Sequence, residues 1–377
     1  MSMESRERVL TALSHRQPDC CPVSFGSSTV DGMTRAAKEK FDAYMGWRPE
    51  DVKTRDFVMG MVETPPQIAD WIRPDFATVW SASQWVERGE RFEDGSYIDA
   101  FGCRLRPISF YYDVAERPLS GPITADDIRR HKWPDPYAPG RTDGLPEQAL
   151  AARAAGRAVL LDIPAIGPFE GGCWVRGFED FLCDLYTDEY LAETLMDAIT
   201  ENTIAFWDAL LSKVAPLVDV CGQGDDVAMQ DRPFVAPEIY QRLIKKYHKR
   251  IFDFIKSKTD AKIFLHVCGS AFDLIPDLID AGIDILEAVQ TSAAKMDPAV
   301  LKREFGCELS FWGAVDTQKL IMSATPGELK AAIFRLAQVL GRDGGYVLAP
   351  THNIQPDVPC ENVAAMLEAF AEIRGIK

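Results

Sequence analysis

Short apolar runs alternate with longer segments of helical periodicity from about residue 157 onward. The apolar runs, which are typical of buried strands, are Ala158–Ile163, Leu217–Val220, Lys262–Val267, Ile283–Val289, Glu308–Trp312 and Tyr346–Leu348. The segments with helical periodicity are Phe178–Leu211, Pro237–Ser257, Phe272–Ala281, Pro298–Phe305, Pro326–Leu340 and Cys360–Ile373. Six alternations of this kind predict parallel strands joined by right-handed crossovers.

Two further apolar runs, Cys21–Phe25 and Phe76–Trp80, bring the number of predicted strands to eight. Eight strands favour a closed (β/α)8 TIM barrel, and residues 1–377 are expected to form a single domain of this α/β class. An open doubly wound sheet is the alternative. It is disfavoured because no GxGxxG phosphate loop follows any strand.

Residues 1–150 are expected to add an N-terminal helical and hairpin extension to the barrel. The first twenty residues form an amphipathic pattern that predicts a helix ending before Pro18. Residues 90–112 alternate polar and apolar around Asp94-Gly95, which indicates a hairpin. The proline-rich stretch Arg117–Gly144 predicts a long surface connection.

Composition and charge exclude several classes of partner. The chain has 377 residues, 41 Lys and Arg against 57 Asp and Glu, and a net charge of −16 without any basic run. Nucleic acid and anionic membrane surfaces are therefore not expected to bind. Nine irregularly spaced cysteines indicate reduced thiols, and hence the cytoplasm. The N-terminus lacks a signal-peptide pattern, and no apolar stretch approaches the ~18 residues of a membrane span.

The end of one predicted strand carries a candidate zinc site. His266 and Cys268 are two residues apart, so they point to the same face of a strand, and nitrogen and sulfur are ligands that Zn²⁺ prefers. A catalytic zinc needs a third protein ligand, for which His352 at the last strand end is the candidate. Cys221 and Glu287 are the fallback ligands. A buried histidine beside a packing cysteine is the alternative interpretation.

Adjacent carboxylates follow another strand. Asp225 and Asp226, with Gln230 close behind, are in a position to contact a substrate or transfer a proton. One of the two aspartates is expected to cap a helix instead. Asp226 is the predicted catalytic residue, and Asp225 and Gln230 are substrate-binding candidates.

Aromatic and charged residues at other strand ends are further candidates for substrate binding. Trp174 and Arg176 offer an aromatic wall and an anion contact, although Arg176 is equally suited to a salt bridge with a nearby helix. Trp312 and Asp316 lie in the segment WGAVDTQ, where Asp316 is alternatively a helix cap.

Six segments resemble the uroporphyrinogen decarboxylase superfamily, and the similarity runs along nearly the whole chain. They are ESRERVLTALSHRQPDCCPVSFG, GPFEGGCWVRGFEDFLCDL, GDDVAMQDRPFVAPEIYQRLIKKYHKRI, HVCGS, FWGAVDTQ and GGYVLAPTHNIQPDVPCENV. Within the superfamily the chain is most similar to the corrinoid-linked methyltransferase branch. That resemblance implies a (β/α)8 barrel and methyl transfer involving a separate corrinoid protein. In that branch an HxC pair, here His266 and Cys268, binds zinc together with a later cysteine.

Two departures from the family pattern bear on the reaction. The methylcobamide:coenzyme M methyltransferases have a cysteine in a Pro-Gly-Cys setting where this chain has Pro350-Thr351-His352. True uroporphyrinogen decarboxylases use N-terminal arginines to receive substrate carboxylates, and the corresponding segment VSFGSSTVDGM has none.

The expected function is therefore zinc-dependent methyl transfer from a small methylated substrate, an aromatic methyl ether, to the cobalamin of a corrinoid protein. A uroporphyrinogen decarboxylase-like decarboxylase, a methylcobamide:thiol methyltransferase and a non-catalytic binding protein are the alternatives. A homodimer is left open.

Overall fold

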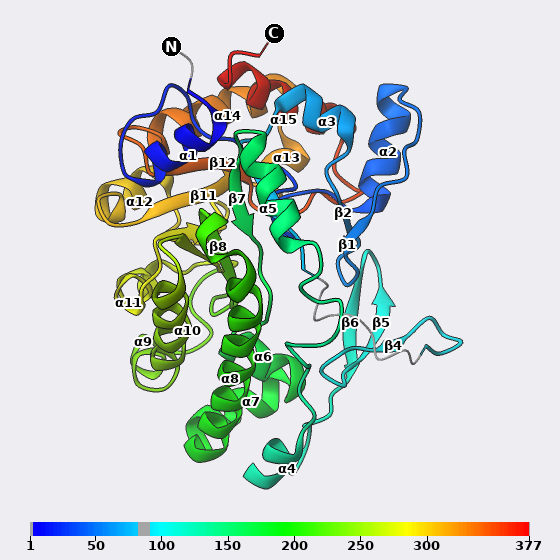
Figure 1. Cartoon of the computed structure of the whole chain (residues 1–377), viewed down its shortest axis with the longest axis vertical. Helices are drawn as coiled ribbons and strands as arrows, with labels where there is room; N and C mark the ends of the chain where they lie inside the picture. The colour runs from blue at the N-terminus through cyan, green and yellow to red at the C-terminus, as the bar shows by residue number, and fades with distance from the viewer. Residues whose placement is uncertain (1–2, 82–90, 377) are drawn as a thin grey trace.

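The computed structural model describes residues 3–81 and 91–376, and its centre is a curled sheet of seven parallel strands (Figure 1). In order across the sheet the strands are β3 (Phe76–Val79), β7 (Ala158–Leu161), β8 (Val220–Gly224), β9 (Lys262–His266), β10 (Ile285–Glu287), β11 (Ser310–Val315) and β12 (Tyr346–Pro350). Every neighbouring pair is parallel. The predicted α/β TIM-barrel fold is therefore confirmed, while the single-domain organisation stays a prediction.

A short N-terminal segment occupies the eighth place, between β12 and β3. Val23 forms an isolated parallel bridge with Leu348, and its carbonyl accepts a hydrogen bond from the Asp75 backbone N–H at 2.9 Å. The predicted strand Cys21–Phe25 is wrong in extent, because only this bridge forms. Pro22 has no N–H to donate, and the N–H of Val23 is taken by the Asp75 carboxylate at 2.8 Å.

Helices form the outer layer around the sheet (Figure 1). Three coincide with their predicted bounds: α12 (Pro298–Phe305), α14 (Pro326–Leu340) and α15 (Cys360–Ile373). The predicted helix Phe178–Leu211 is two helices, α7 (Phe178–Thr187) and α8 (Glu189–Val214). The break falls at Asp188, whose carboxylate accepts a hydrogen bond from the N–H of Leu191 and caps α8.

Two other predicted helices are irregular at their starts. The segment predicted over Pro237–Ser257 consists of α9 (Pro237–Ile239), a π-helical turn η2 (Tyr240–Ile244) and α10 (Lys245–Lys258). The segment predicted over Phe272–Ala281 begins as the 3-10 turn η3 (Phe272–Leu274) and continues as α11 (Ile275–Ala281). The strand predicted over Leu217–Val220 begins later, because the 3-10 turn η1 (Ala215–Leu217) occupies its first residue.

The N-terminal helix α1 (Ser5–Leu13) packs against the interior of the barrel. Its Val9 and Leu13 belong to a buried cluster with Phe76, Phe264, Trp312 and other inward-facing strand residues. The carbonyl of Ala12 accepts a hydrogen bond from the N–H of Gly345, directly before β12. This helix therefore covers the end of the barrel where the strands begin. The loops that follow the carboxyl ends of the strands lie at the opposite end.

The extension predicted within residues 1–150 contains a three-stranded antiparallel sheet. Its strands are β4 (Tyr97–Ile98), β5 (Arg104–Ile108) and β6 (Tyr111–Glu116), and it projects beside the barrel in Figure 1. The predicted turn at Asp94-Gly95 is present, with the N–H of Gly95 donating to the Phe92 carbonyl. The second turn, between β5 and β6, was not predicted, and residue 90, where the hairpin pattern begins, lies outside the described residues.

Short elements that the sequence pattern did not indicate complete the chain. They are α2 (Arg35–Met45), β1 (Thr54–Asp56), β2 (Met61–Val62), α3 (Pro66–Ile72), α4 (Ala125–Arg130), α5 (Leu145–Ala154), α6 (Pro168–Val175) and α13 (Leu320–Ser323). The predicted surface connection thus contains the helix α4.

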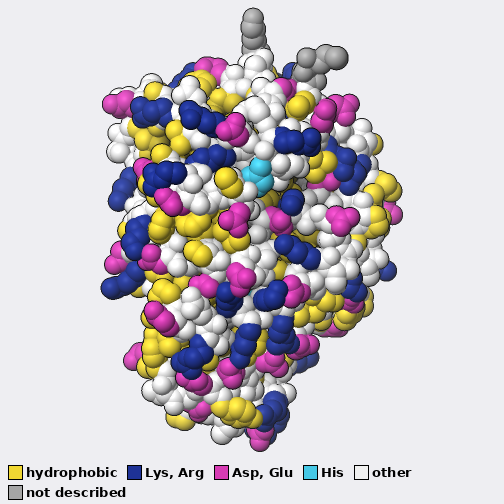
Figure 2. Space-filling view, turned by 90° about the vertical axis from the view of Figure 1, so that its left-hand side faces the viewer, with side chains coloured by type: hydrophobic (Ala, Val, Ile, Leu, Met, Phe, Trp, Pro, Cys, Tyr) yellow, Lys and Arg dark blue, Asp and Glu magenta, His cyan; other side chains and the backbone are white. Residues whose placement is uncertain are grey.

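All nine cysteines are free thiols. Within residues 3–81 and 91–376, every helix is too short or too polar to cross a membrane. Figure 2 shows acidic and basic side chains interspersed over one face of the molecule.

Candidate active site

A cavity of about 300 Å³ opens at the carboxyl ends of the strands. This is the end of a (β/α)8 barrel where active sites occur. Its chemistry is acidic and aromatic. The acidic lining residues are Asp56, Asp162, Glu170 and Asp226, the large aromatic ones are Trp80, Tyr111, Tyr112 and Trp174, and the cationic or nitrogen-bearing ones are Arg55, His266 and His352.

Three potential metal ligands lie together at the cavity. One donor atom each from His266, Cys268 and His352 falls within 4.8 Å of the other two. The Cys268 sulfur is 3.4 Å from Nε2 of His266, and the two imidazole rings are 6.0 Å apart between centroids. His266 is the last residue of β9, Cys268 follows two residues later, and His352 comes two residues after β12. The structure therefore brings together the three side chains chosen from the sequence.

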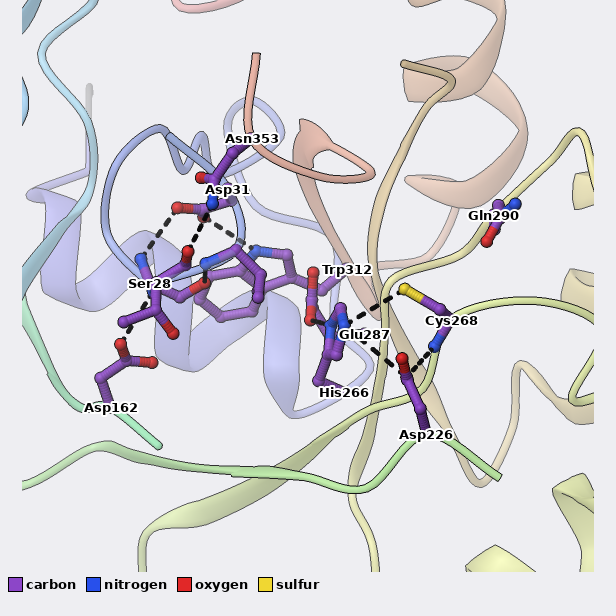
Figure 3. Close-up of polar contacts among 12 residues, drawn as sticks. Ser28, Asp31, Asp162, Asp226, His266, Cys268, Glu287, Gln290, Trp312 and Asn353 are labelled. Carbon is purple, nitrogen blue, oxygen red and sulfur yellow. Dashed lines mark hydrogen bonds and ion pairs between the residues drawn. The ribbon is translucent and has the colours of Figure 1, made fainter. Parts of the chain in front are cut away.

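The buried carboxylate of Glu287 orients His266 (Figure 3). Glu287 ends β10 and contacts Nδ1 of His266, so that Nε2 faces Cys268. Metal-binding histidines commonly donate their second ring nitrogen to a carboxylate, which fixes the tautomer and strengthens the ligand. Glu287 thus contacts a candidate ligand and is not itself one of the three clustered donors.

Burial and neighbouring charges shift the pKa values of all three candidate ligands. Burial lowers the pKa of His266, but the negative charges of Glu287 and Cys268 outweigh it and raise that pKa well above its usual value. Burial and the charge of His266 lower the pKa of His352 to about 3. Burial, followed by the charge of Asp226, raises the pKa of Cys268 to about 11. A nitrogen, sulfur and nitrogen donor set with an orienting carboxylate fits zinc, whose charge would favour the thiolate.

Asp226 lines the cavity beside the candidate ligands. One of its carboxylate oxygens accepts a hydrogen bond from the N–H of Cys268 at 2.6 Å and lies 3.9 Å from Nε2 of His266. The same residue is partly exposed, so its carboxylate faces the space that a substrate would occupy. This placement is the one expected of a residue that contacts substrate.

Asp225 is directed away from the cavity, although it is adjacent in sequence. It is fully buried and accepts hydrogen bonds from the N–H groups of Phe169 and Glu170 at 3.1 and 2.6 Å, in the first turn of α6. It also contacts Nε2 of His248 at 2.6 Å. Asp225 therefore anchors a helix terminus and does not line the described cavity, which does not support its predicted role in substrate binding.

Trp174 and Arg176 have different surroundings. Trp174 lines the cavity, and its indole N–H donates to Asp99 at 2.8 Å. Arg176 is buried away from the cavity, where it bonds Asp184 at 2.8 Å and the carbonyl of Leu119 at 2.9 Å. Arg176 therefore forms the salt bridge that was the alternative interpretation, and the predicted anion contact is wrong.

Three other substrate-binding candidates lie outside the cavity lining. Gln230 is exposed and donates to the Ser292 carbonyl at 2.8 Å. Trp312 is buried inside the barrel and stacks on Phe76. Asp316 accepts hydrogen bonds from the backbone N–H groups that start α13, so it is a helix cap. None of these three residues lines the described cavity, so their surroundings do not support the predicted substrate contacts.

The fallback ligand Cys221 also lies apart from the cluster. It is fully buried in β8, and burial alone raises the pKa of its thiol far above the usual value. Its side chain belongs to the hydrophobic core between the strands and the helices. Cys221 is therefore a packing residue.

Several cavity residues escaped sequence reasoning. Asp162 follows β7 in the segment LDIPAIG, and Glu170 lies in the first turn of α6. Asp162 directly follows the end of β7, and Glu170 lies in the segment that leads from β7 into α6, so the position of this segment at a strand end was an available signal. Arg55, Asp56 and the tyrosines of β6 carried no such signal, because the extension reaches the cavity only through tertiary packing.

An α/β barrel with a His-Cys-His cluster under an acidic and aromatic cavity defines a class of candidate zinc-binding barrels. Sequence comparison then gives the family. The profile of the uroporphyrinogen decarboxylase (URO-D) family matches residues 98–373, so the chain belongs to this family. The family predicted from the quoted sequence segments is confirmed.

Relatives within the family differ in their described activities. The chain is 26% identical over 215 residues to a methylcobamide:CoM methyltransferase of Methanosarcina barkeri, covering 56% of this chain and 59% of that protein. It is 23% identical over 290 residues to a uroporphyrinogen decarboxylase of Coxiella burnetii, covering 70% of this chain and 73% of that protein. The match to the first of these relatives therefore spans less than two thirds of its length.

The fold also matches a solved structure. A methyltransferase from Methanosarcina mazei superposes with a TM-score of 0.66 at 19% identity, covering 98% of this chain and 99% of that one. At this identity the match establishes the shared fold. The reaction has to be argued from the site.

Proposed function

We propose that this protein is a corrinoid-dependent methyltransferase that takes a methyl group from an aromatic methyl ether and passes it to a corrinoid carried by a separate protein. The observation that carries the proposal is the His266, Cys268 and His352 cluster, which lies at a cavity lined by four large aromatic side chains. The described activities of the Methanosarcina relatives support the choice of methyl transfer within the family.

Zinc is the metal we assign to the cluster, where it would supply a Lewis acid for the ether oxygen. The protein's own groups prepare that position. Glu287 fixes the tautomer of His266, and Asp226 holds the backbone of Cys268 through its N–H. The aromatic walls are suited to a flat ring and exclude water from it.

The transfer balances with the corrinoid in its cobalt(I) state as the acceptor. The bond between the methyl carbon and the ether oxygen breaks, and its electron pair stays on the oxygen as a phenolate. An electron pair from cobalt forms the new bond to the methyl carbon. Asp226 is placed to orient the leaving oxygen. Alternatively, it donates a proton to the phenolate, which gives a phenol.

Glu170 is a second candidate for the proton. It lines the cavity near Asp226, whose N–H points toward its carboxylate at 3.4 Å. Burial, followed by the charges of Asp226 and Asp225, raises the pKa of Glu170 to about 8. A carboxyl group with this pKa retains a proton at neutral pH and is able to donate it.

Methylcobamide:thiol methyl transfer is the second candidate. It is favoured by the similarity to the methylcobamide:CoM methyltransferase of Methanosarcina barkeri and to a methylated-thiol–coenzyme M methyltransferase of Methanosarcina mazei, which is 21% identical over 294 residues. The aromatic lining and a histidine in place of the third cysteine argue for the ether instead. Decarboxylation of a porphyrinogen fits less well, because the described residues that line the cavity include four carboxylates and one arginine. A substrate with eight carboxylates calls for several cationic partners.

The experiment combines metal analysis with a spectroscopic assay. The purified protein should contain zinc, and with reduced corrinoid protein and a panel of methoxylated aromatics it should form methylcobalamin, seen in the cobalt spectrum. Cys268→Ser should lose both zinc and transfer, because a hydroxyl is a far poorer ligand than a thiolate. Cys221→Ala, which changes a buried cysteine outside the cluster, should keep zinc.

Zinc-replete protein that transfers no methyl group from any donor on the panel would contradict the ether hypothesis. Transfer between methylcobalamin and a thiol under the same conditions would establish the second candidate. Zinc-free protein with full activity would contradict the role of the cluster.

A further inference from the structure

Asp162 lines the cavity, and one of its carboxylate oxygens has no hydrogen-bond partner among the described residues. The residue follows β7 and is only 6% exposed, and one carboxylate oxygen accepts a hydrogen bond from the N–H of Thr29 at 2.8 Å. The other oxygen, Oδ1, is buried without a hydrogen-bond partner in the described part of the chain. Such an atom costs free energy unless a ligand or water supplies a donor. In Figure 3, Asp162 lies on the side of His266 away from Cys268.

We propose that Asp162 is a specificity-determining residue that accepts a hydrogen bond from a hydroxyl group of the methyl donor, so that the site selects uncharged methoxyphenols over methoxylated aromatic acids. This inference rests on the proposed function and names the substrate class for the same site. It assigns Asp162 to ligand recognition and leaves the methyl-transfer step to the groups around Cys268.

The charge of the cavity lining supports an uncharged donor. Asp162 shares the lining with three further carboxylate side chains, those of Asp56, Glu170 and Asp226. A carboxylate on the ligand would enter a partly buried space that already raises the pKa of Asp162 to about 7 and of Glu170 to about 8, so a further negative charge is disfavoured there. A phenolic hydroxyl carries no charge and supplies the donor that Oδ1 lacks.

Arg55 is the arginine among the described lining residues, and it is already engaged. Its guanidinium pairs with Glu63 and lies 4.8 Å from the ring centroid of Trp80. Burial lowers the pKa of Arg55 to about 10, which shows how little compensation its surroundings give to the charge. Among the described lining residues, one arginine that is paired with Glu63 does not offset the acidic groups.

The size and walls of the cavity suit a single substituted ring. Its volume of about 300 Å³ lies at the small end of ligand pockets. Trp80, Tyr111, Tyr112 and Trp174 supply flat apolar surface. Burial raises the pKa of Asp162 to about 7, which means that its surroundings disfavour the ionised carboxylate. A hydroxyl donor on the ligand would stabilise that ionised form.

The test is direct binding without the corrinoid protein. Titration calorimetry on the metal-loaded protein at pH 8 would compare 2-methoxyphenol, 1,2-dimethoxybenzene and 4-hydroxy-3-methoxybenzoate. The first has the hydroxyl, the second lacks it, and the third adds a carboxylate. We expect 2-methoxyphenol to bind at least about tenfold more tightly than either of the others, because a site built to pair a hydroxyl discriminates against analogues that lack it.

Asp162→Asn should remove that preference, because the amide cannot offer two acceptor oxygens. Binding of 2-methoxyphenol should weaken by about tenfold and that of 1,2-dimethoxybenzene should stay within about twofold. Asp231→Asn, at an exposed carboxylate outside the lining, is the control and should leave all three affinities unchanged. An unaltered thermal unfolding temperature would show that Asp162→Asn remains folded.

Tighter binding of the methoxybenzoate than of 2-methoxyphenol, or an Asp162→Asn variant with unchanged preference, would overturn the inference. The proposed function fails separately. If 2-methoxyphenol binds with the expected dependence on Asp162 but no methylcobalamin forms with reduced corrinoid protein, the ligand preference stands and the methyl-transfer proposal is wrong. If all three compounds transfer methyl groups equally well in the Asp162→Asn variant and in the unmodified protein, the methyl-transfer proposal stands and the proposed ligand preference is wrong.

Discussion

His266 and Glu287 are register partners at the ends of the adjacent parallel strands β9 and β10, and the Glu287 carboxylate contacts Nδ1 of the imidazole. Both side chains are buried, and their pairing leaves Nε2 of His266 facing Cys268 at 3.4 Å. The strand register therefore selects which nitrogen of the histidine is offered to a metal. Without Glu287, Nδ1 of the ring would lose the carboxylate that fixes its tautomer.

Glu287→Gln should weaken zinc binding by about 10- to 100-fold, which is the usual effect of removing a carboxylate that supports a histidine ligand. The glutamine retains the size of the side chain but removes its charge. Competition with a chromophoric chelator measures the affinity directly. Gln230→Glu, at an exposed position outside the cavity lining, serves as the control. An unchanged zinc affinity in Glu287→Gln would show that the His266 contact is only structural.

His352 should be the third ligand, and its replacement should be visible in the spectrum of bound cobalt(II). His352→Ala should bind cobalt(II) more weakly, because two protein ligands remain. His352→Cys should retain the metal and strengthen the absorption that arises from thiolate-to-metal charge transfer, since a second sulfur joins the site. Equal cobalt affinity in the unmodified protein and His352→Ala would exclude His352 from the ligand set.

The fold and the metal cluster were predictable because both depend on local patterns. The alternation of apolar runs and helical segments gave seven strand positions, and the spacing of His266 and Cys268 gave a shared strand face. The strand predicted over Cys21–Phe25 was too long, because a sequence pattern does not show that the Asp75 carboxylate accepts the hydrogen bond from the N–H of Val23.

The cavity lining was harder to predict, since its residues come from distant parts of the chain. Arg55 and Tyr111 reach the cavity from the extension, and no periodicity links them to the strand ends. Arg176, Trp312 and Asp316 were assigned to substrate because of their place in the sequence. The alternatives offered by the sequence, a salt bridge to a nearby helix for Arg176 and a helix-start contact for Asp316, match their contacts with Asp184 and with the N–H groups that precede and start α13. The contact of Trp312 with Phe76 joins distant strands and is not specified by the sequence pattern.

The stability of the metal-free protein should fall as pH rises between about 4 and 8. Burial is the main cause that raises the pKa of Asp31 to about 6, of Asp162 to about 7 and of Glu170 to about 8. The folded protein therefore binds more protons than the unfolded chain across this window, and the free energy of unfolding decreases with pH there. Acid destabilisation by other groups would be superimposed at the lower end.

Thermal unfolding in the presence of a chelator, at pH 6 and pH 8, measures this effect. Asp162→Asn should reduce the difference between the two unfolding temperatures, because an amide has no proton to lose in this range. Asp231→Asn, which removes an exposed carboxylate, should leave the difference unchanged. A difference that is identical in Asp162→Asn and the unmodified protein would contradict the raised pKa of Asp162.

Neutralising the two adjacent aspartates should have opposite consequences. Asp225 is fully buried and holds both the first turn of α6 and His248, whose other ring nitrogen is 2.8 Å from the Tyr240 hydroxyl. Asp225→Asn should therefore lower the free energy of unfolding by about 2 kcal/mol, since a buried charge-assisted contact is weakened. Asp226→Asn should change stability by less than about 1 kcal/mol, because its carboxylate is partly exposed at the cavity.

The same two variants should also differ in activity, and here Asp226→Asn should be the more strongly affected. Asp226→Asn should slow methyl transfer by about 100-fold with zinc content retained, because it removes a group placed to orient or protonate the leaving oxygen. Asp225→Asn should retain most of the activity at temperatures where it is folded. Denaturant unfolding and single-turnover transfer to cobalt(I) measure the two properties independently. Full turnover by Asp226→Asn would leave Glu170 as the proton donor, and Glu170→Gln would then be the variant that loses activity.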